Sequence, residues 1–235
     1  MSVLLLRLAA PLQSWGAASR FVRRETRHEP TKSGVLGLLA AAEGRRRTDP
    51  VEDLARTSFG VRVDQPGRLV RDFQTARSLD GTRTMPLSYR FYLADAVFLA
   101  GVEGGPSLLH GLDEALRAPV FPLFLGRRSC PPSGQVSLGV REGGLQEVLQ
   151  GEPWQAALWW RKRQGPRLDL PIVRDAADPA EPGDLVRDQP ISYDPERREY
   201  GWRTVVHGEP ARITNTDAAP GARSRVDFLA ALGGA

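Results

Sequence analysis

The stretch LGRRSCPP, residues 125–132, places two adjacent arginines in a stiff loop. Gly126 allows another group to approach closely, and two prolines fix the exit of the chain. Arg127 and Arg128 carry planar forks of N–H donors that match phosphate oxygens, and Ser129 adds a hydroxyl. Because crowded positive charges require a counter-charge, we predict that this loop binds phosphates or base edges of a nucleic acid.

A second basic segment covers roughly residues 65–92 and interrupts the apolar pattern on either side. The pair Asp80-Gly81 favours a tight turn, so the segment is predicted to be a ribbon that projects and folds back there. Aromatic residues alternate with arginines along it, a combination suited to single-stranded nucleic acid. The arginines are Arg68, Arg71, Arg77, Arg83 and Arg90.

A third basic group lies before and at the start of the first predicted helix. The loop carries Arg20, Arg23, Arg24 and Arg27. Lys32 and Ser33 follow at the helix N-terminus, where free N–H groups and the helix dipole favour a phosphate. By contrast, residues 45–47 are arginines just after the helix C-terminus, where the dipole alone favours cations, so we assign them no ligand.

Composition excludes several classes of protein. One cysteine rules out an internal disulfide, and His28, His110 and His207 are too scattered to predict a metal site, so we expect neither metal nor cofactor. The apolar N-terminal run is interrupted by Arg7 and has no basic residues ahead of it, unlike a signal peptide. We expect a cytoplasmic protein without membrane segments.

The elements alternate in an order that predicts an α+β fold. Strands are expected at residues 3–9, 56–63, from about 91 and at 120–126, with helices at 33–44 and 107–117. This βαββαβ order is that of a ferredoxin-like domain over residues 1–140, with the basic ribbon inserted between the second and third strands. Residues 141–235 are predicted to be a small, irregular region with one helix at 152–164 and a hairpin at 192–208, which leaves a degenerate second lobe open.

Several motifs together resemble the CasD family, the type I-E branch of the fifth CRISPR-associated (Cas) family in the RAMP superfamily. They are LLLRLAAPLQSWG, EPTKSGVLGLLAAAEGR, RDFQTAR, YRFYLADAVFLAG and LFLGRRSCPPS, within residues 2–133. The resemblance implies a ferredoxin-like RAMP domain whose inserted ribbon is a "thumb". It places Arg90 against RNA at the base of the thumb, and Gln74 and Arg77 on the matching arm.

The resemblance also implies a role. Such a protein is a non-catalytic subunit of Cascade that binds the 5′ handle of the CRISPR RNA (crRNA), beside a CasC-type backbone subunit and a CasA-type large subunit. Target DNA is then contacted only through the complex, because base pairing by the guide reads the target sequence.

Two other functions stay open from the residues alone. A metal-independent endoribonuclease that processes CRISPR precursor RNA needs a general base and acid, yet the ribbon contains neither histidine nor lysine, and only His28 lies in a basic setting. A free-standing RNA-binding regulator would need to be stable alone. The exposed ribbon and the proline-rich C-terminal stretch favour burial against partners instead.

Overall fold

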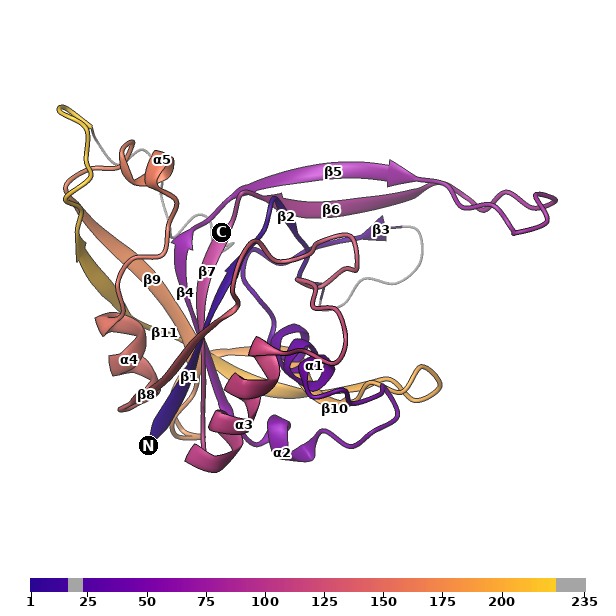
Figure 1. Cartoon of the computed structure of the whole chain (residues 1–235), viewed down its shortest axis with the longest axis horizontal. Helices are drawn as coiled ribbons and strands as arrows, with labels where there is room; N and C mark the ends of the chain where they lie inside the picture. The colour runs from indigo at the N-terminus through magenta and orange to yellow at the C-terminus, as the bar shows by residue number, and fades with distance from the viewer. Residues whose placement is uncertain (17–22, 223–235) are drawn as a thin grey trace.

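Figure 1 shows the chain as a computed structural model that describes residues 1–16 and 23–222. The elements in chain order are β1 (Ser2–Ala9), β2 (Leu12–Gln13), β3 (Arg23–Arg24), α1 (Lys32–Ala42), α2 (Glu52–Ala55), β4 (Ser58–Gln65), β5 (Arg68–Gln74), β6 (Ser88–Ala94), β7 (Val97–Gly104), α3 (Pro106–Arg117), β8 (Ser137–Glu142), α4 (Leu145–Gly151), α5 (Leu158–Arg161), β9 (Arg167–Asp175), β10 (Asp184–Ser192) and β11 (Glu199–Thr214).

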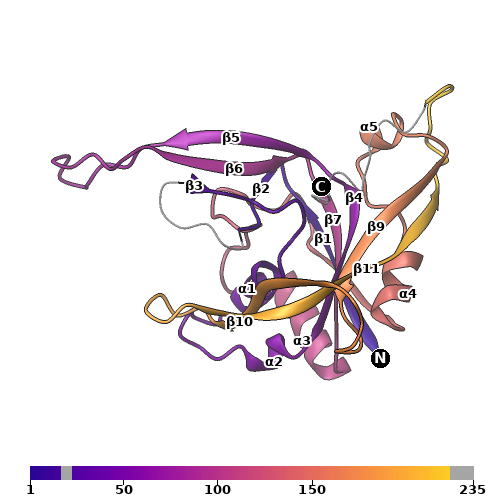
Figure 2. The same cartoon turned by 180° about the vertical axis from the view of Figure 1, so that it is seen from behind.

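A seven-stranded antiparallel sheet organises the molecule, with the strand order β10-β11-β9-β4-β7-β1-β8. The sheet is strongly curled, with α1 and α3 on one face and α4 on the other (Figures 1 and 2). Apolar side chains from both faces form one large buried cluster. The fold is therefore mixed α/β around a single core.

The most apolar predicted elements are confirmed. The expected strand at residues 3–9 is β1, which is buried along almost its whole length. The expected helices at 33–44 and 107–117 are α1 and α3. Thr31 caps α1 because its hydroxyl accepts a hydrogen bond from the Gly34 N–H at 3.2 Å.

The predicted strand at residues 120–126 is wrong. The N–H groups of Val120 and Phe121 donate to the carbonyls of Ala42 and Ala41, so this segment satisfies the C-terminal end of α1 rather than a sheet edge. The strand that pairs with β1 on the side away from β7 is β8, further along the chain.

The predicted strand beginning near residue 91 is two strands. Asp95 has a φ of +59° and breaks the run between β6 and β7. β6 leaves the main sheet, pairs along its length with β5 and is flanked by the short strands β2 and β3. The β5–β6 hairpin extends far from the body and ends in a bent tip (Figures 1 and 2).

The predicted half-buried strand at 56–63 is β4, and it is buried on both faces. The alternation placed Arg62 in solvent, but its side chain is 0% exposed. It forms an ion pair with Asp64, with Nε to Oδ1 at 2.7 Å, and donates to the carbonyls of Leu149, Glu152 and Pro153. A buried guanidinium is tolerable here because it is satisfied on every side.

The C-terminal third is neither small nor irregular. It supplies β9, β10 and β11, and β9 pairs with β4, so the main sheet is continuous across residue 140. The expected helix at 152–164 is only the four-residue α5, while a separate helix, α4, precedes it. The expected hairpin at 192–208 lies within β10–β11, whose strands are longer than the sequence indicated.

The described residues contain neither a candidate membrane-spanning helix nor a candidate metal cluster. No helix within residues 1–16 and 23–222 is both long and apolar enough to cross a membrane. The same part of the chain contains no cluster of three or more His, Cys, Asp or Glu side chains arranged to hold a metal ion.

Candidate nucleic-acid interface

The β5–β6 hairpin presents arginines that are free to meet an anion. Arg71, Arg77 and Arg83 are exposed, and in the described part of the chain none of them forms an ion pair. Arg71 lies over the ring of Tyr89, with its guanidinium carbon 5.4 Å from the ring centroid. The structure therefore brings these three predicted residues onto one projecting element.

One face of the hairpin is apolar and aromatic as well as basic. Strand alternation puts Leu69, Arg71 and Phe73 on the same face of β5. Tyr89 of β6 is the direct cross-strand neighbour of Phe73. Phe73 is 66% exposed and Leu69 54% exposed, although such side chains are normally buried. Aromatic faces beside guanidinium groups suit unpaired bases and phosphates.

Asp80 holds the turn at the hairpin tip by hydrogen bonds and does not neutralise the arginines beside it. Its carboxylate accepts hydrogen bonds from the Ser78 hydroxyl and from the N–H and hydroxyl of Thr82. These bonds, led by that from Ser78, lower the pKa of Asp80. Gly81 adopts a φ of +72° at the turn. Asp80 is therefore a turn residue, and the neighbouring arginines keep their charge uncompensated.

Gln74 and Arg90 lie in the paired part of the hairpin and are less free than the three exposed arginines. The Gln74 side-chain amide donates to Asp72 at 3.1 Å, and Asp72 lies opposite Arg90 in the strand register. Arg90 is half-buried, and its Nε is shielded from solvent with no hydrogen-bond partner in the described structure. A buried, unpartnered donor on a cation costs free energy, so Arg90 is the residue here most in need of an external acceptor.

Arg127 is tied to the protein itself. Its Nη1 donates to the Phe91 carbonyl at 3.1 Å and its Nη2 to the Arg24 carbonyl at 2.9 Å, and the guanidinium lies 4.6 Å from the centroid of the Tyr92 ring. These groups belong to β6 and to β3, which pairs with β6 at Tyr89 and Arg90. Arg127 therefore joins two elements of the protein, and its predicted contact with RNA stays a prediction.

Arg128 and Ser129 remain exposed in the loop after Arg127. Gly126 makes this loop possible because its φ is +85° and a Cβ there would lie 1.6 Å from the Ser14 carbonyl oxygen. The Ser129 hydroxyl lies 3.9 Å from the neighbouring Cys130 sulfur. In this loop Arg127 therefore bonds to the protein itself, while Arg128 is exposed and can bind a ligand.

The four arginines predicted to form a basic loop before α1 have different environments. Arg20 lies outside the described residues, and of Arg23 only the backbone is described, in β3 beside β6. Arg24 is exposed, whereas the Nε of Arg27 is 3.0 Å from a carboxylate oxygen of Glu29. The expected RNA contact of Arg27 is therefore not supported, because its charge is already paired.

Lys32 is a structural residue, contrary to the prediction. Its side chain is 5% exposed and its Nζ lies 2.9 Å from Asp175. Arg203 bridges Asp175 and Asp188, and the Asp188 carboxylate accepts the backbone N–H of Lys32 at 2.9 Å. The anion at the α1 N-terminus is thus a carboxylate from β10, which leaves no place for a phosphate on that N–H. Burial lowers the pKa of Lys32.

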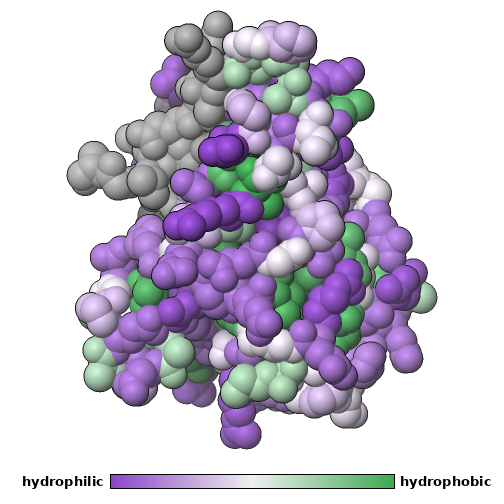
Figure 3. Space-filling model, turned by 90° about the vertical axis from the view of Figure 1, so that its left-hand side faces the viewer, coloured by the Kyte–Doolittle hydropathy of each residue, from purple (hydrophilic) through white to green (hydrophobic). Residues whose placement is uncertain are grey.

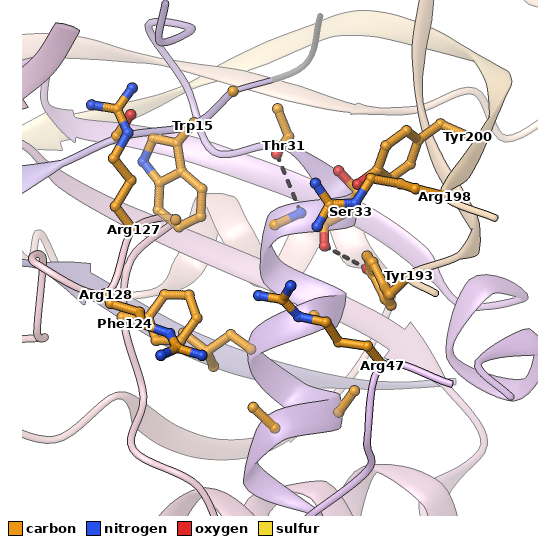
Figure 4. A pocket seen from close by; sticks show the side chains of 18 of the residues that line it. Trp15, Thr31, Ser33, Arg47, Phe124, Arg127, Arg128, Tyr193, Arg198 and Tyr200 are labelled. Carbon is orange, nitrogen blue, oxygen red and sulfur yellow. Dashed lines mark hydrogen bonds between the residues drawn. The ribbon is translucent and has the colours of Figure 1, made fainter. Parts of the chain in front are cut away.

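Ser33 is buried, but it lines a cleft of about 1050 Å³ beside α1. Its carbonyl accepts the hydroxyl of Tyr193, and burial raises the pKa of that tyrosine, so the hydroxyl stays protonated. Figure 4 shows α1 crossing the cleft between the loop of Arg127 and Arg128 and the side chains of Tyr193, Arg198 and Tyr200. Trp15 lies at its inner wall and is fully buried, as a packing residue.

The cleft is strongly basic. Among the residues that the structure describes, eight arginines line it against a single carboxylate residue, Glu25. They are Arg24, Arg45, Arg46, Arg47, Arg127, Arg128, Arg187 and Arg198. Arg45 is neutralised by Asp53 and Glu43, which raise its pKa. The rest leave a large positive surface facing a concave space, where field lines concentrate.

Comparison with known proteins decides the family. Residues 3–206 match the family described as CRISPR-associated protein (Cas_Cas5). The chain belongs to the Cas5 family. The CRISPR system Cascade subunit CasD of Escherichia coli (strain K12) is 35% identical over 175 residues, which cover 65% of this chain and 78% of that protein.

Two solved structures are similar over almost all of this Cas5-family chain. A Cas protein solved by crystallography is 42% identical, with a TM-score of 0.72, and the match covers 92% of this chain and 97% of that one. A chain of a CRISPR RNA-guided surveillance complex is 29% identical, with a TM-score of 0.74, and the match covers 98% of each chain. The C-terminal strands of this Cas5 protein therefore lie within the shared fold.

Sequence reasoning missed the half of the Cas5 cleft that comes from Arg46, Arg47 and the β10–β11 hairpin. Residues 45–47 were assigned to the helix dipole, and nothing local marks Arg187 or Arg198 as facing α1. The long-range contact is carried by the Asp175 and Asp188 network, whose partners are more than a hundred residues apart in the chain. Only the run of basic and aromatic residues at 193–202 was a usable signal.

Proposed function

We propose that this protein is the subunit of a type I-E Cascade complex that holds the 5′ handle of the crRNA without cutting it. The family and the similarity to a Cascade subunit and to a chain of an RNA-guided surveillance complex support a role in such an assembly. The observation that carries RNA binding is the β5–β6 hairpin, which projects unpaired arginines and exposed aromatic rings together.

The proposal assigns parts of the fold. The strands β4-β7-β1-β8, with α1 after β1 and α3 after β7, have the order of a ferredoxin-like sheet. The β5–β6 hairpin lies between β4 and β7 in the chain, at the position of the thumb. We propose that it closes over the RNA, with Arg71, Gln74, Arg77, Arg83 and Arg90 along its length and Arg24, Arg128 and Ser129 beside β6.

The partners follow from the same proposal. The apolar hairpin face would be covered by RNA together with a CasC-type backbone subunit, and a CasA-type large subunit would dock at the same end of the complex. Target DNA would be reached only through the complex, by guide pairing in the cytoplasm.

Copurification tests this function. The variant Arg71→Ala/Arg77→Ala/Arg83→Ala removes three exposed, unpaired charges. A control with the same charge change, Arg56→Ala/Arg167→Ala/Arg212→Ala, alters three exposed arginines elsewhere. With tagged protein coexpressed with a CRISPR array and the other subunits, we expect the hairpin variant to lose at least about tenfold in bound crRNA, since three phosphate contacts are worth several kcal/mol. Equal crRNA in both variants would refute the proposal.

The absence of cleavage is tested separately. Purified protein incubated with end-labelled repeat RNA should leave it intact, because the hairpin offers arginines but no histidine or lysine to exchange a proton. Specific cleavage that disappears in His28→Ala would instead identify a nuclease.

A further inference from the structure

Two short crossings attach the β5–β6 hairpin to the main sheet (Figures 1 and 2). Residues 65–68 run from β4 to β5, and residues 94–97 run from β6 to β7. On the side of the body Gln65 pairs with Val97. On the side of the hairpin Arg68 pairs with Ala94, so the two crossings lie side by side. We call these residues the joint, because they set the direction in which the hairpin leaves the sheet.

Each crossing contains a residue in the left-handed backbone region. Gly67 has a φ of +73° and Asp95 a φ of +59°, and among the residues that the structure describes Asp95 is the one non-glycine residue with a positive φ. Such a residue persists there only where its surroundings hold it. The crossings are also crowded, since a Cβ on Gly67 would lie 2.6 Å from the Ala94 carbonyl oxygen. The joint is therefore a closely packed turn and not a loose tether.

Groups of the body hold the second crossing by hydrogen bonds. The Asp95 N–H donates to the Pro11 carbonyl at 3.1 Å, and the Asp95 carbonyl accepts the side-chain amide of Gln65. The Ala96 carbonyl accepts the side-chain amide of Gln13 at 2.7 Å. Both glutamines are almost fully buried, and satisfied polar groups in the interior make the structure around them rigid.

Gln65 is in turn held by the segment that follows α4. Its side-chain carbonyl accepts the Ala157 N–H at 3.3 Å. Next to it, the Asp64 carboxylate accepts the Gln155 N–H at 2.5 Å, and the Asp64 carbonyl accepts the Trp154 indole N–H at 2.9 Å. One amide side chain therefore links the hairpin, the main sheet and the C-terminal third.

We propose that Gln65 is a positioning residue that fixes the direction of the β5–β6 hairpin, so that its RNA-binding side chains are already in place in the free protein. Pre-organisation of this kind raises affinity, because less conformational freedom is lost on binding. The inference rests on the proposed function and deepens it: the hairpin covers RNA without first changing its direction. The C-terminal third then contributes to RNA binding through the joint.

Spin labels measure the direction of the hairpin in the full-length protein. Cys130→Ser gives a background without cysteine, in which Leu87→Cys carries a label on the hairpin and Glu114→Cys a label on α3, both at exposed positions. For this parent protein we expect one narrow distance distribution by pulsed electron paramagnetic resonance. Added single-stranded RNA that carries the host CRISPR repeat should leave it unchanged. A broad distribution that narrows only with RNA overturns the inference.

Gln65→Met keeps the size of the side chain but removes the donor to Asp95, so the distance distribution should broaden. RNA affinity should fall roughly three- to tenfold, because only part of the population then holds the binding direction. The slope of log affinity against log salt should stay as in the parent, since the same phosphates are contacted. The matched control is Gln189→Met, which removes a side-chain amide of β10 bonded to the Ala55 carbonyl at 2.6 Å. It should lower the melting temperature similarly and change neither the distance nor the affinity.

Gly67→Ala tests the joint by a second route. The added methyl group meets the Ala94 carbonyl and must shift the crossing, so the distance between the labels should change. Gly134→Ala, at a φ of +80° with open space around it, is the matched control and should leave the distance unchanged. If Gln65→Met and Gly67→Ala fold and keep the parent distance, the inference is wrong. If either fails to fold, the parent measurement with and without RNA still decides whether the hairpin is pre-organised.

Two outcomes separate this inference from the proposed function. If the free parent gives one narrow distance but Arg71→Ala/Arg77→Ala/Arg83→Ala binds RNA as tightly as the parent, the joint stands and the proposed function fails. If the arginine variant loses RNA while Gln65→Met keeps both distance and affinity, the proposed function stands and the role of Gln65 is wrong.

Discussion

At the scale of the residue, adjacent arginines differ in function because of their partners. Arg127 is held by the carbonyls of Phe91 and Arg24, while Arg128 next to it is exposed. The sequence RR predicted both as ligands for RNA, since a local pattern contains no information about carbonyls from β6 and β3. The same holds for Lys32 and Arg27. Lys32 forms an ion pair with Asp175, far along the chain, and Arg27 forms one with Glu29, two residues away.

This difference predicts opposite effects for two substitutions. Arg127→Ala removes two charge-assisted hydrogen bonds and should lower the free energy of unfolding by about 2 kcal/mol. It should also speed hydrogen exchange in β6, whose Phe91 carbonyl it holds. Arg128→Ala should leave both unchanged and reduce RNA affinity. Chemical denaturation and hydrogen-exchange mass spectrometry measure the two effects, and equal destabilisation by both variants would contradict the assignment.

At the scale of the element, the sequence predicted helices, strands and turns correctly where one local signal was strong. β1, α1 and α3 have strong apolar patterns or caps, and the hairpin turn has its Asp-Gly pair. The predicted strand at residues 120–126 is wrong, because an equally apolar segment with Pro122 closes the C-terminal end of α1. Apolar content predicts burial, but whether the backbone pairs with a strand or with a helix end depends on tertiary position.

The loop of residues 125–130 allows a matched test of such an element. Gly126→Ala demands a positive φ and also places a methyl group on the Ser14 carbonyl. Gly134→Ala demands nearly the same φ, +80°, but has open space around it. The control Gly134→Ala should lower the free energy of unfolding by about 1–2 kcal/mol. Gly126→Ala should lower it clearly more, because the loop must also move away from Ser14. Denaturant titration decides, and equal costs would show that the loop adapts freely.

At the scale of the whole molecule, the C-terminal third is part of the same folding unit as the rest. On the face shown in Figure 3, hydrophilic residues surround scattered apolar groups, as on an ordinary outer surface. The contacts that matter lie inside, where Leu145, Leu149 and Leu170 belong to the same buried cluster as Leu4 and Phe98. Composition after residue 140 is rich in proline, glycine and charge, so the sequence alone predicted an irregular region. It could not reveal that β9 would complete the sheet beside β4.

A fragment of residues 1–142 should therefore fail to fold by itself. Without β9, β4 becomes an open sheet edge, and without residues 149–153 the fully buried Arg62 loses three carbonyl acceptors. The fragment also lacks Leu145, Leu149 and Leu170 of the buried core, and each such side chain contributes about 1.5–3 kcal/mol of the 5–15 kcal/mol that stabilises a typical domain. Circular dichroism melts of the fragment should show no cooperative transition. The variant Arg62→Met in the same fragment removes the buried charge but leaves the edge exposed, so it too should not fold. A cooperative melt of the unmodified fragment would mean that the first 142 residues form a domain of their own.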